Sequence, residues 1–143
     1  MERVLIVGEH NPHSRDDRHA LHPHPKGAAG SRLCKILGMA PCEYLETFDR
    51  ANLLKTARWS TKRARAAAGG LSHKKRILLG ARVAAAHGVK FYPFHRYYLT
   101  VFHDGVDILV LPHPSGRCRI WNDRAAIVAA RDAVKRFMEA PTE

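Results

Sequence analysis

The sequence predicts an α/β fold: a three-layer α/β/α sandwich around a short, mostly parallel central sheet. Two observations lead to this prediction. Continuous apolar runs at residues 4–7 (VLIV) and 77–79 (ILL) each end in glycine, and such runs are typical of strands buried on both faces. These runs alternate with amphipathic or alanine-rich segments of helical periodicity. A length of 143 residues and a hydrophobic content of 45% suit one domain, residues 1–143, with one core.

The first half of the chain is expected to hold two strands and two helices. Ser31 is a plausible N-cap of the first helix, Gly38 ends it, and Pro41 lies in the first turn of the second. The long loop has no periodicity, which is typical of functional loops. In chain order the expected elements are a strand over 4–7, a loop over 9–27, helices over 30–38 and 41–48, and a weak strand over 50–54.

The second half is expected to complete the sheet and its cover. Asp104-Gly105 is a strong hairpin signal. Asn122 or Asp123 can cap the last helix, which places Ile127, Ala130, Val134 and Phe137 on one face. The expected elements are a helix and a basic loop within 56–75, a strand over 76–80, a helix over 81–88, a hairpin over 97–112 and a helix over 123–138.

Charge is the most unusual feature of the composition. Lys and Arg number 24 against 13 Asp and Glu, which gives a net charge of +11. Because cations displace the counterions condensed on phosphates, a small basic domain of this kind indicates a nucleic-acid partner. A basic surface with no ligand is the alternative interpretation of charge alone.

The remaining composition restricts the class of protein. No apolar run approaches the ~20 residues of a membrane span, and the first residues lack the features of a signal peptide. We therefore expect a soluble, cytoplasmic protein that does not bind membranes. Cys34, Cys42 and Cys118 form no CxxC pair, so neither a disulfide framework nor a four-cysteine iron–sulfur site is expected.

Polar residues follow several of the expected strands. The segment 8–14 (GEHNPHS) follows the first strand, Asn52 lies at the end of the second, and 113–117 (HPSGR) follows the second arm of the hairpin. Ligands of open α/β sheets bind beyond the carboxyl ends of the strands. We therefore expect these three segments to converge on one crevice.

The same segments resemble the motifs of the uracil-DNA glycosylase superfamily. "GEHNPH" is similar to the first motif, written elsewhere as GQDPYH, GINPG or GEAPG, and "LPHPSGR" is similar to the second, HPSP or HPSG. Between them, "RANLLK" resembles the strand that carries the base-binding Asn, and "RILLGARVAAAHG" the strand and helix with the LLG signature. The four pieces come in family order and cover most of the chain, so the resemblance implies this fold and a divergent branch.

The resemblance implies roles for the catalytic residues. Such enzymes hydrolyse the N-glycosidic bond of a flipped-out base and leave an abasic site. The sequence shows no convincing set of metal ligands, so we expect no cofactor and no metal. Neutral His113 would donate a hydrogen bond to the base as negative charge develops. Asn11, directly before Pro12, would position the attacking water. Glu9 is the rival, because GEAPG branches place a Glu after the Gly and this chain has one residue more than GxNP.

The resemblance also implies a base-binding set. Asn52 would bind the Watson–Crick edge of uracil, since an amide both donates and accepts. An aromatic residue stacks on the base in the family, and here His22 and His24 are the candidates, with His24 preferred on spacing. His13 stands where other branches exclude the thymine methyl, so a 5-substituted uracil such as 5-hydroxymethyluracil could enter. Gly8 and His10 complete the pocket.

Residues that contact DNA are expected on three segments. Arg117 takes the place of the residue that inserts into the emptied base stack, and uracil-containing DNA is the implied partner of a monomeric protein. Phosphate contacts would come from Ser14, Ser115, Gly116, Lys74 and Lys75.

Two other functions remain open at this stage. A metal-dependent nuclease could use His22 and His24 with Asp16 and Asp17. A catalytically weak protein on the same fold could bind uracil-DNA tightly, or become trapped on it covalently through His73 in the basic loop 72–76.

Overall fold

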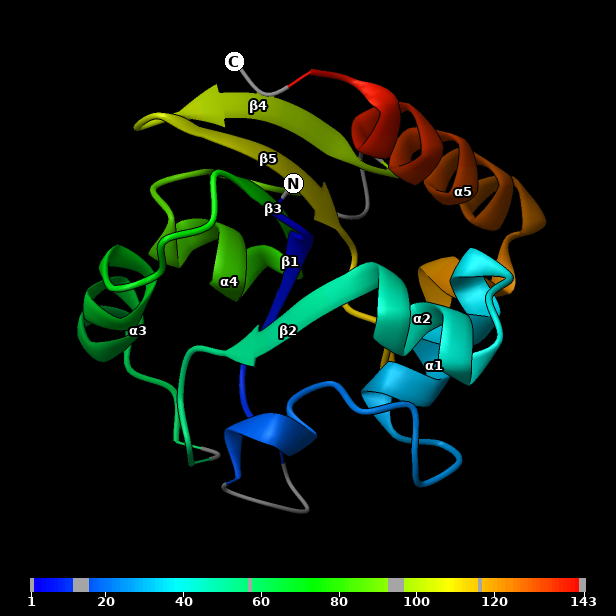
Figure 1. Cartoon of the computed structure of the whole chain (residues 1–143), viewed down its shortest axis with the longest axis horizontal. Helices are drawn as coiled ribbons and strands as arrows, with labels where there is room; N and C mark the ends of the chain where they lie inside the picture. The colour runs from blue at the N-terminus through cyan, green and yellow to red at the C-terminus, as the bar shows by residue number, and fades with distance from the viewer. Residues whose placement is uncertain (1, 12–15, 57, 93–96, 116, 142–143) are drawn as a thin grey trace.

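The computed structural model describes residues 2–11, 16–56, 58–92, 97–115 and 117–141. Five strands form one sheet in the order β2-β1-β3-β5-β4, shown in Figure 1. Neighbouring strands are parallel except for the β4–β5 hairpin. The strands are β1 (Val4–Gly8), β2 (Phe48–Asn52), β3 (Lys75–Leu79), β4 (Leu99–His103) and β5 (Val106–Leu111).

Helices cover both faces of this sheet, which confirms the predicted three-layer α/β/α architecture. Side chains of adjacent strand residues alternate between two apolar clusters. Ile6 and Ile77 belong to the cluster under α1, α2 and α5, whereas Val7 and Leu78 belong to the cluster under α3 and α4. The helices are α1 (Ala29–Leu37), α2 (Pro41–Thr47), α3 (Thr61–Gly69), α4 (Ala81–Ala86) and α5 (Arg124–Glu139).

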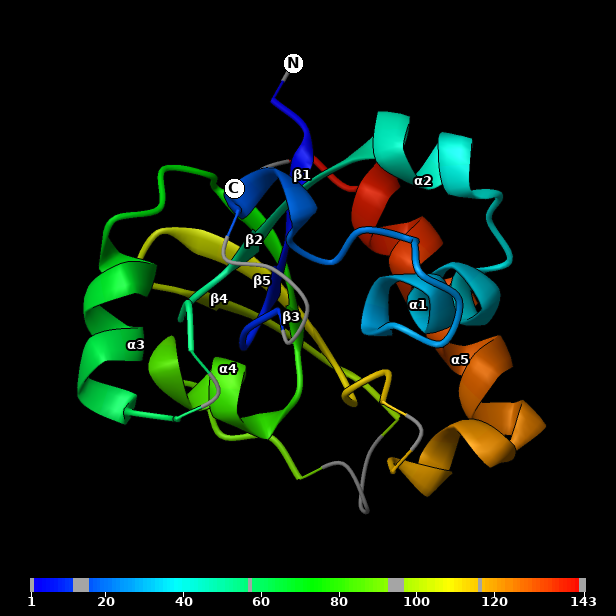
Figure 2. The same ribbon diagram turned by 90° about the horizontal axis from the view of Figure 1, so that it is seen from below.

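The parallel strands all end at the same edge of the sheet, which faces the viewer in Figure 2. Gly8 pairs with Asn52 in the β1–β2 register, so the two strand ends are adjacent. Beyond them the chains stay together, because the amides of Leu53 and Leu54 donate to the carbonyls of Gly8 and Glu9 at 3.0 and 2.9 Å. This carboxyl edge carries the loops in which the sequence places its motifs.

Two predicted boundaries are wrong. Ser31 does not cap α1, because the helix already begins at Ala29 and its cap residue Ala28 makes no side-chain hydrogen bond. The second strand covers Phe48–Asn52 rather than 50–54. Its residues after Phe48 are half-buried, as expected of an edge strand. The prediction was shifted because it placed the apolar pair Leu53-Leu54 inside the strand, whereas both residues follow it.

Other elements match their prediction closely. Asp123 caps α5, with its side chain accepting from the amide of Ala125 at 2.9 Å. Gly38 ends α1 in the left-handed conformation, at φ 69°. The sequence did not predict two short 3-10 helices, η1 (Asp17–His19) and η2 (Arg119–Asn122). None of the helices in the described ranges is long and apolar enough to cross a bilayer.

Candidate functional site

An open cleft of about 1160 Å³ lies at the carboxyl edge of the sheet. Its walls come from the chain after β1, from the segment that leads into α1, and from the chain after β5. The cleft therefore brings together the segment after β1 and the segment after β5, as expected from the two motifs. The side chains that matter below are Glu9, His10, Asn11, His19, Leu21, His22, His24, Arg32, His113, Ser115 and Arg117.

His113 is held in one tautomer by its own loop. The amide of Ser115 donates to Nδ1 of His113 at 3.1 Å, and the indole of Trp121 donates to the His113 carbonyl at 3.0 Å. Because Nδ1 accepts a hydrogen bond, the proton of the neutral ring must sit on Nε2. Burial lowers the pKa of His113, and the nearby Glu9 carboxylate only partly opposes this effect. The ring is thus a neutral Nε2–H donor.

Gly80 makes room for this histidine. It follows β3, adopts φ 95°, and donates its amide to the Leu111 carbonyl at 2.8 Å. A Cβ atom at this position would stand 3.3 Å from Cβ of His113. The glycine of the LLG signature therefore joins the ends of β3 and β5 and lets the histidine loop pack closely.

Asn11 and Glu9 both line the cleft but have different contacts. Nδ2 of Asn11 donates to the His19 carbonyl at 2.8 Å, which fixes the plane of the amide. Oε1 of Glu9 lies 3.5 Å from Nη1 of Arg82. Each side chain presents an oxygen acceptor that could orient a water molecule.

Three histidine rings follow one another along the part of the cleft formed by the segment that leads into α1. The rings of His19 and His22 are 6.3 Å apart between centroids, and those of His22 and His24 are 5.7 Å apart. The amide of His24 donates to Nδ1 of His22 at 3.3 Å. Burial, with help from the charge of Arg50, lowers the pKa of His22. His24 is therefore one member of a row, and His19 was missed because nothing in its local sequence separates it from a solvated loop residue.

The backbone of Leu21 and His22, which carries part of this row, is fixed by contacts with α1 and α2. Leu21 adopts φ 51°, a left-handed conformation that costs a non-glycine residue free energy. Its carbonyl accepts a hydrogen bond from the buried hydroxyl of Tyr44 at 2.9 Å. Gly30 passes so close that a Cβ atom there would lie 2.2 Å from the Leu21 oxygen and 2.3 Å from that of His22. Sequence reasoning missed Tyr44 and Gly30, which act from α2 and α1.

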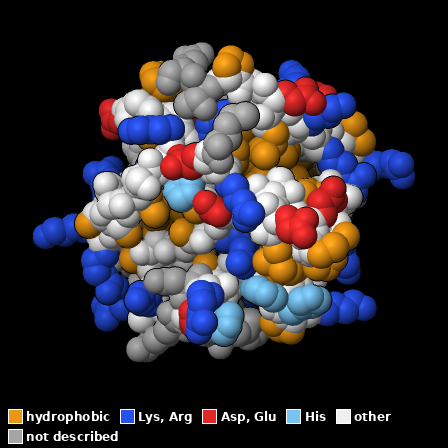
Figure 3. All heavy atoms as spheres, in the orientation of Figure 1, with side chains coloured by type: hydrophobic (Ala, Val, Ile, Leu, Met, Phe, Trp, Pro, Cys, Tyr) orange, Lys and Arg blue, Asp and Glu red, His pale blue; other side chains and the backbone are white. Residues whose placement is uncertain are grey.

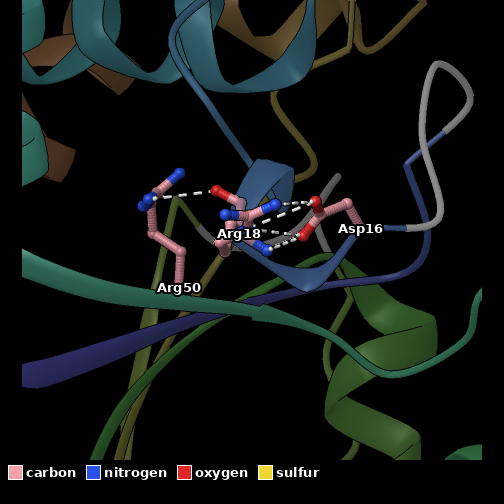
Figure 4. A network of polar contacts seen from close by, with 3 residues as sticks. All are labelled: Asp16, Arg18 and Arg50. Atoms are coloured by element: carbon pink, nitrogen blue, oxygen red, sulfur yellow. Dashed lines mark hydrogen bonds and ion pairs between the residues drawn. The ribbon is translucent and has the colours of Figure 1, made fainter.

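Arg50 fixes the neighbouring η1 segment, as Figure 4 shows. From β2 it donates to the Ala20 carbonyl at 2.9 Å and to the Arg18 carbonyl at 3.4 Å. Arg18 in turn donates to both carboxylate oxygens of Asp16, and these hydrogen bonds lower the pKa of Asp16. The Asp16 carboxylate is thus engaged by an arginine.

Asn52 stands at the predicted strand end but below the cleft. Its Oδ1 is buried without a hydrogen-bond partner among the described residues. A Cβ atom on Gly8 would lie 2.7 Å from this oxygen and 3.0 Å from Cδ2 of Leu21. Gly8 therefore leaves the space that the side chains of Asn52 and Leu21 occupy. Oδ1 of Asn52 can accept a hydrogen bond, and no described residue donates one.

The structure does not bring Lys74 and Lys75 to the cleft. Lys74 directly precedes β3 and Lys75 is its first residue, so both lie at the opposite edge of the sheet. The ammonium of Lys75 donates to carbonyls of Phe137 and Ala140, and it stands 5.0 Å from the Phe137 ring centroid. In the same loop, Nε2 of His73 is 2.7 Å from Oδ2 of Asp49. The predicted phosphate contacts of Lys74 and Lys75 at the cleft are therefore wrong, because a basic run in the sequence does not indicate which edge of the sheet it occupies.

Two arginines nevertheless line the cleft, and other cations lie elsewhere on the surface. Arg32 and Arg117 are exposed side chains on its rim. In Figure 3 blue side chains gather over the α3 side of the molecule and histidines toward the lower edge. The exposed basic residues of α3 are Lys62, Arg63 and Arg65. Three predicted site residues, His13, Ser14 and Gly116, lie outside the described residues.

The described part of the chain contains no group of three His, Cys, Asp or Glu side chains that could hold a metal ion. A scan against models of protein families and a search of curated proteins each find no match for this chain.

Proposed function

We propose that this protein is a monofunctional DNA glycosylase. It hydrolyses the N-glycosidic bond of uracil, or of a 5-substituted uracil such as 5-hydroxymethyluracil, after the base has flipped out of DNA, and leaves an abasic site. The resemblance of "GEHNPH" and "LPHPSGR" to the two motifs of uracil-DNA glycosylases supports this proposal. So does the net charge of +11, which suits a polyanionic partner.

The observation that carries the proposal is the tautomer of His113. Breaking the glycosidic bond leaves negative charge on the departing base, and a fixed donor that meets this charge lowers the barrier. The Ser115 amide occupies Nδ1, so Nε2–H is the donor that remains for a ligand. Burial lowers the pKa of the ring, so the donor is a neutral imidazole whose Nε2–H meets the developing negative charge.

The remaining roles follow from the walls of the cleft. Asn11 positions the water, with its amide held by the His19 carbonyl. The base lies against the histidine row, and His24 and His10 contact it. Asn52 does not line the cleft; its buried Oδ1 would accept from a base N–H if the base inserted deeply enough to reach it. Arg117 and Ser115 contact the DNA strand.

A glycosylase assay tests the proposal directly. Oligonucleotides with a single uracil, 5-hydroxymethyluracil, thymine or hypoxanthine are incubated with the protein, and abasic sites are then cleaved with alkali. We expect cleavage at uracil or 5-hydroxymethyluracil that persists in excess EDTA. His113→Ala should slow single-turnover cleavage by about 10²–10³, the usual effect of losing one such donor, with little change in DNA affinity.

His103→Ala is the matched control, because this histidine ends β4 at the opposite edge of the sheet. Its substitution should leave the rate unchanged. Absence of base release from all four substrates would refute the glycosylase proposal. Activity that EDTA abolishes and zinc restores would favour a metal-dependent hydrolase.

A further inference from the structure

Arg82 stands between an aromatic ring and a carboxylate beside the cleft. Its guanidinium carbon lies 5.8 Å from the ring centroid of Trp59, and its Nη1 lies 3.5 Å from Oε1 of Glu9. Arg82 belongs to the first turn of α4, Trp59 to the segment before α3, and Glu9 to the chain after β1. Three segments that are distant in sequence therefore meet at one guanidinium group.

The aromatic side of this arrangement is firmly anchored. Nε1 of Trp59 donates to Oγ1 of Thr61 at 3.2 Å, and the ring packs against the apolar cluster under α3 and α4. The next residue, Ser60, caps α3 by accepting from the Arg63 amide at 3.3 Å. An indole face attracts a cation, so Trp59 offers Arg82 a fixed platform.

The carboxylate side reaches the proposed reaction centre. The Glu9 side chain is only 20% exposed, whereas that of Arg82 is 59% exposed. Burial has the largest effect and lowers the pKa of His113. Two titratable groups in the chain after β1 also act on it: Glu9 opposes burial by raising the pKa, and His10 lowers it further. Because Glu9 and His113 line the same cleft, the carboxylate also repels an anion that forms at His113.

We propose that Arg82 is a positioning residue of this site: it holds the Glu9 carboxylate against the wall of the cleft and offsets its charge beside His113. A departing anionic base then meets less repulsion. The effect on rate rests on the proposed function, whereas the effect on His113 does not require any reaction.

Titration of the His113 ring by NMR in the whole protein is the direct test. Arg82→Ala should raise the pKa of His113, because a cation is lost and the Glu9 carboxylate is left unopposed. Arg82→Lys keeps the charge and should stay close to wild type. Adding Glu9→Gln to Arg82→Ala should lower the pKa again, since the source of the effect has been removed.

Arg136→Ala is the matched control, because Arg136 also forms an exposed ion pair, 2.9 Å from Asp132 on α5. It removes one positive charge from a side chain that is 61% exposed and should leave His113 unchanged. An unchanged titration in Arg82→Ala, or an equal shift in Arg136→Ala, would overturn the assignment to Arg82.

Single-turnover cleavage of uracil-DNA supplies the second measurement. Arg82→Ala should slow it by about two- to five-fold, the range expected of an exposed ion pair, and Glu9→Gln in the same chain should restore it. The two proposals fail separately. If the His113 shift occurs but wild type releases no base, the glycosylase proposal fails and the Arg82–Glu9 coupling stands. If wild type is active and Arg82→Ala alters neither quantity, only the role of Arg82 fails.

Discussion

Asn11 and Glu9 are two residues apart and are rivals for the water-positioning role. Their contacts now favour Asn11: its amide is fixed by the His19 carbonyl, whereas Glu9 is turned toward Arg82. We expect Asn11→Ala to lower the single-turnover rate by about 10², because it removes a contact made mainly in the transition state. Glu9→Gln should be mild.

The comparison of these two variants also tests the alignment of the first motif. If Glu9→Gln lowers the single-turnover rate strongly and Asn11→Ala does not, the water-positioning role belongs to Glu9. Asn11 would then be a structural residue that ties the chain after β1 to η1. Rates from the same single-turnover assay, with DNA affinity measured in parallel, separate a loss of chemistry from a loss of binding.

Among the elements, α1 and the histidine row depend on each other through Gly30. A methyl group there would overlap the carbonyls of Leu21 and His22. We expect Gly30→Ala to lower the free energy of unfolding by about 1–3 kcal/mol, as overpacking typically does, and to weaken DNA binding. Urea denaturation and a binding titration are the measurements.

Gly69→Ala is the matched control for that experiment. Gly69 ends α3, and a Cβ atom there would meet nothing within 4 Å. This substitution should be neutral or stabilise the protein by up to about 1 kcal/mol, since alanine is the better helix former. If both variants were equally stable, the close approach of α1 to the Leu21 loop would not hold in solution.

The elements also show what the sequence could and could not predict. Strands β1 and β3 were predicted because their apolar runs end in glycine, and β5 was predicted as the second arm of a hairpin because Asp104-Gly105 is a specific turn signal. The edge strand β2 was predicted two residues too late, because its half-buried residues show no clear alternation of apolar and polar side chains. The wall of the cleft depends on contacts over more than twenty residues, such as Tyr44 with Leu21, which local patterns do not contain.

For the whole molecule, the distribution of charge predicts which cations DNA should contact. With about five phosphates neutralised, the slope of log affinity against log salt should be roughly −4 to −5 on duplex DNA. Arg32→Ala, on the rim of the cleft, should reduce the slope by about one phosphate. Lys74→Ala removes an equal charge at the opposite edge and should leave it unchanged. Equal effects of the two variants would show that net charge, rather than the cleft, governs binding.

The stability of the whole domain should depend on pH through three partly buried histidines. Burial is the main cause of a lowered pKa in His22, His87 and His113. Above the ordinary histidine pKa of about 6.5, folded and unfolded states are both neutral and stability does not change on this account. As pH falls below that value, the unfolded chain binds protons that the folded chain does not, so the free energy of unfolding decreases.

His87 allows this prediction to be tested away from the cleft. Its Nδ1 is 2.9 Å from the Val83 carbonyl, and its Nε2 is buried without a partner in the described part of the chain. In urea titrations between about pH 7 and pH 5, His87→Leu should show a shallower loss of stability than wild type. An unchanged slope would mean that His87 is not a source of the acid sensitivity.

Gly8 and Gly30 are packed so closely that a side chain would not fit at either position. These two positions can therefore be used to recognise other chains with this site. We expect the wall to keep its shape when a histidine of the row is exchanged for another flat side chain, because the backbone is held by Tyr44 and by the close approach of Gly30. Any side chain at Gly30 meets backbone oxygens, and one at Gly8 meets Asn52. A search profile that gives most weight to Gly8, Gly30, Tyr44 and Asn52, and little to the histidines, would therefore select distant homologues by the shape of their cleft, whatever base or other ligand they hold.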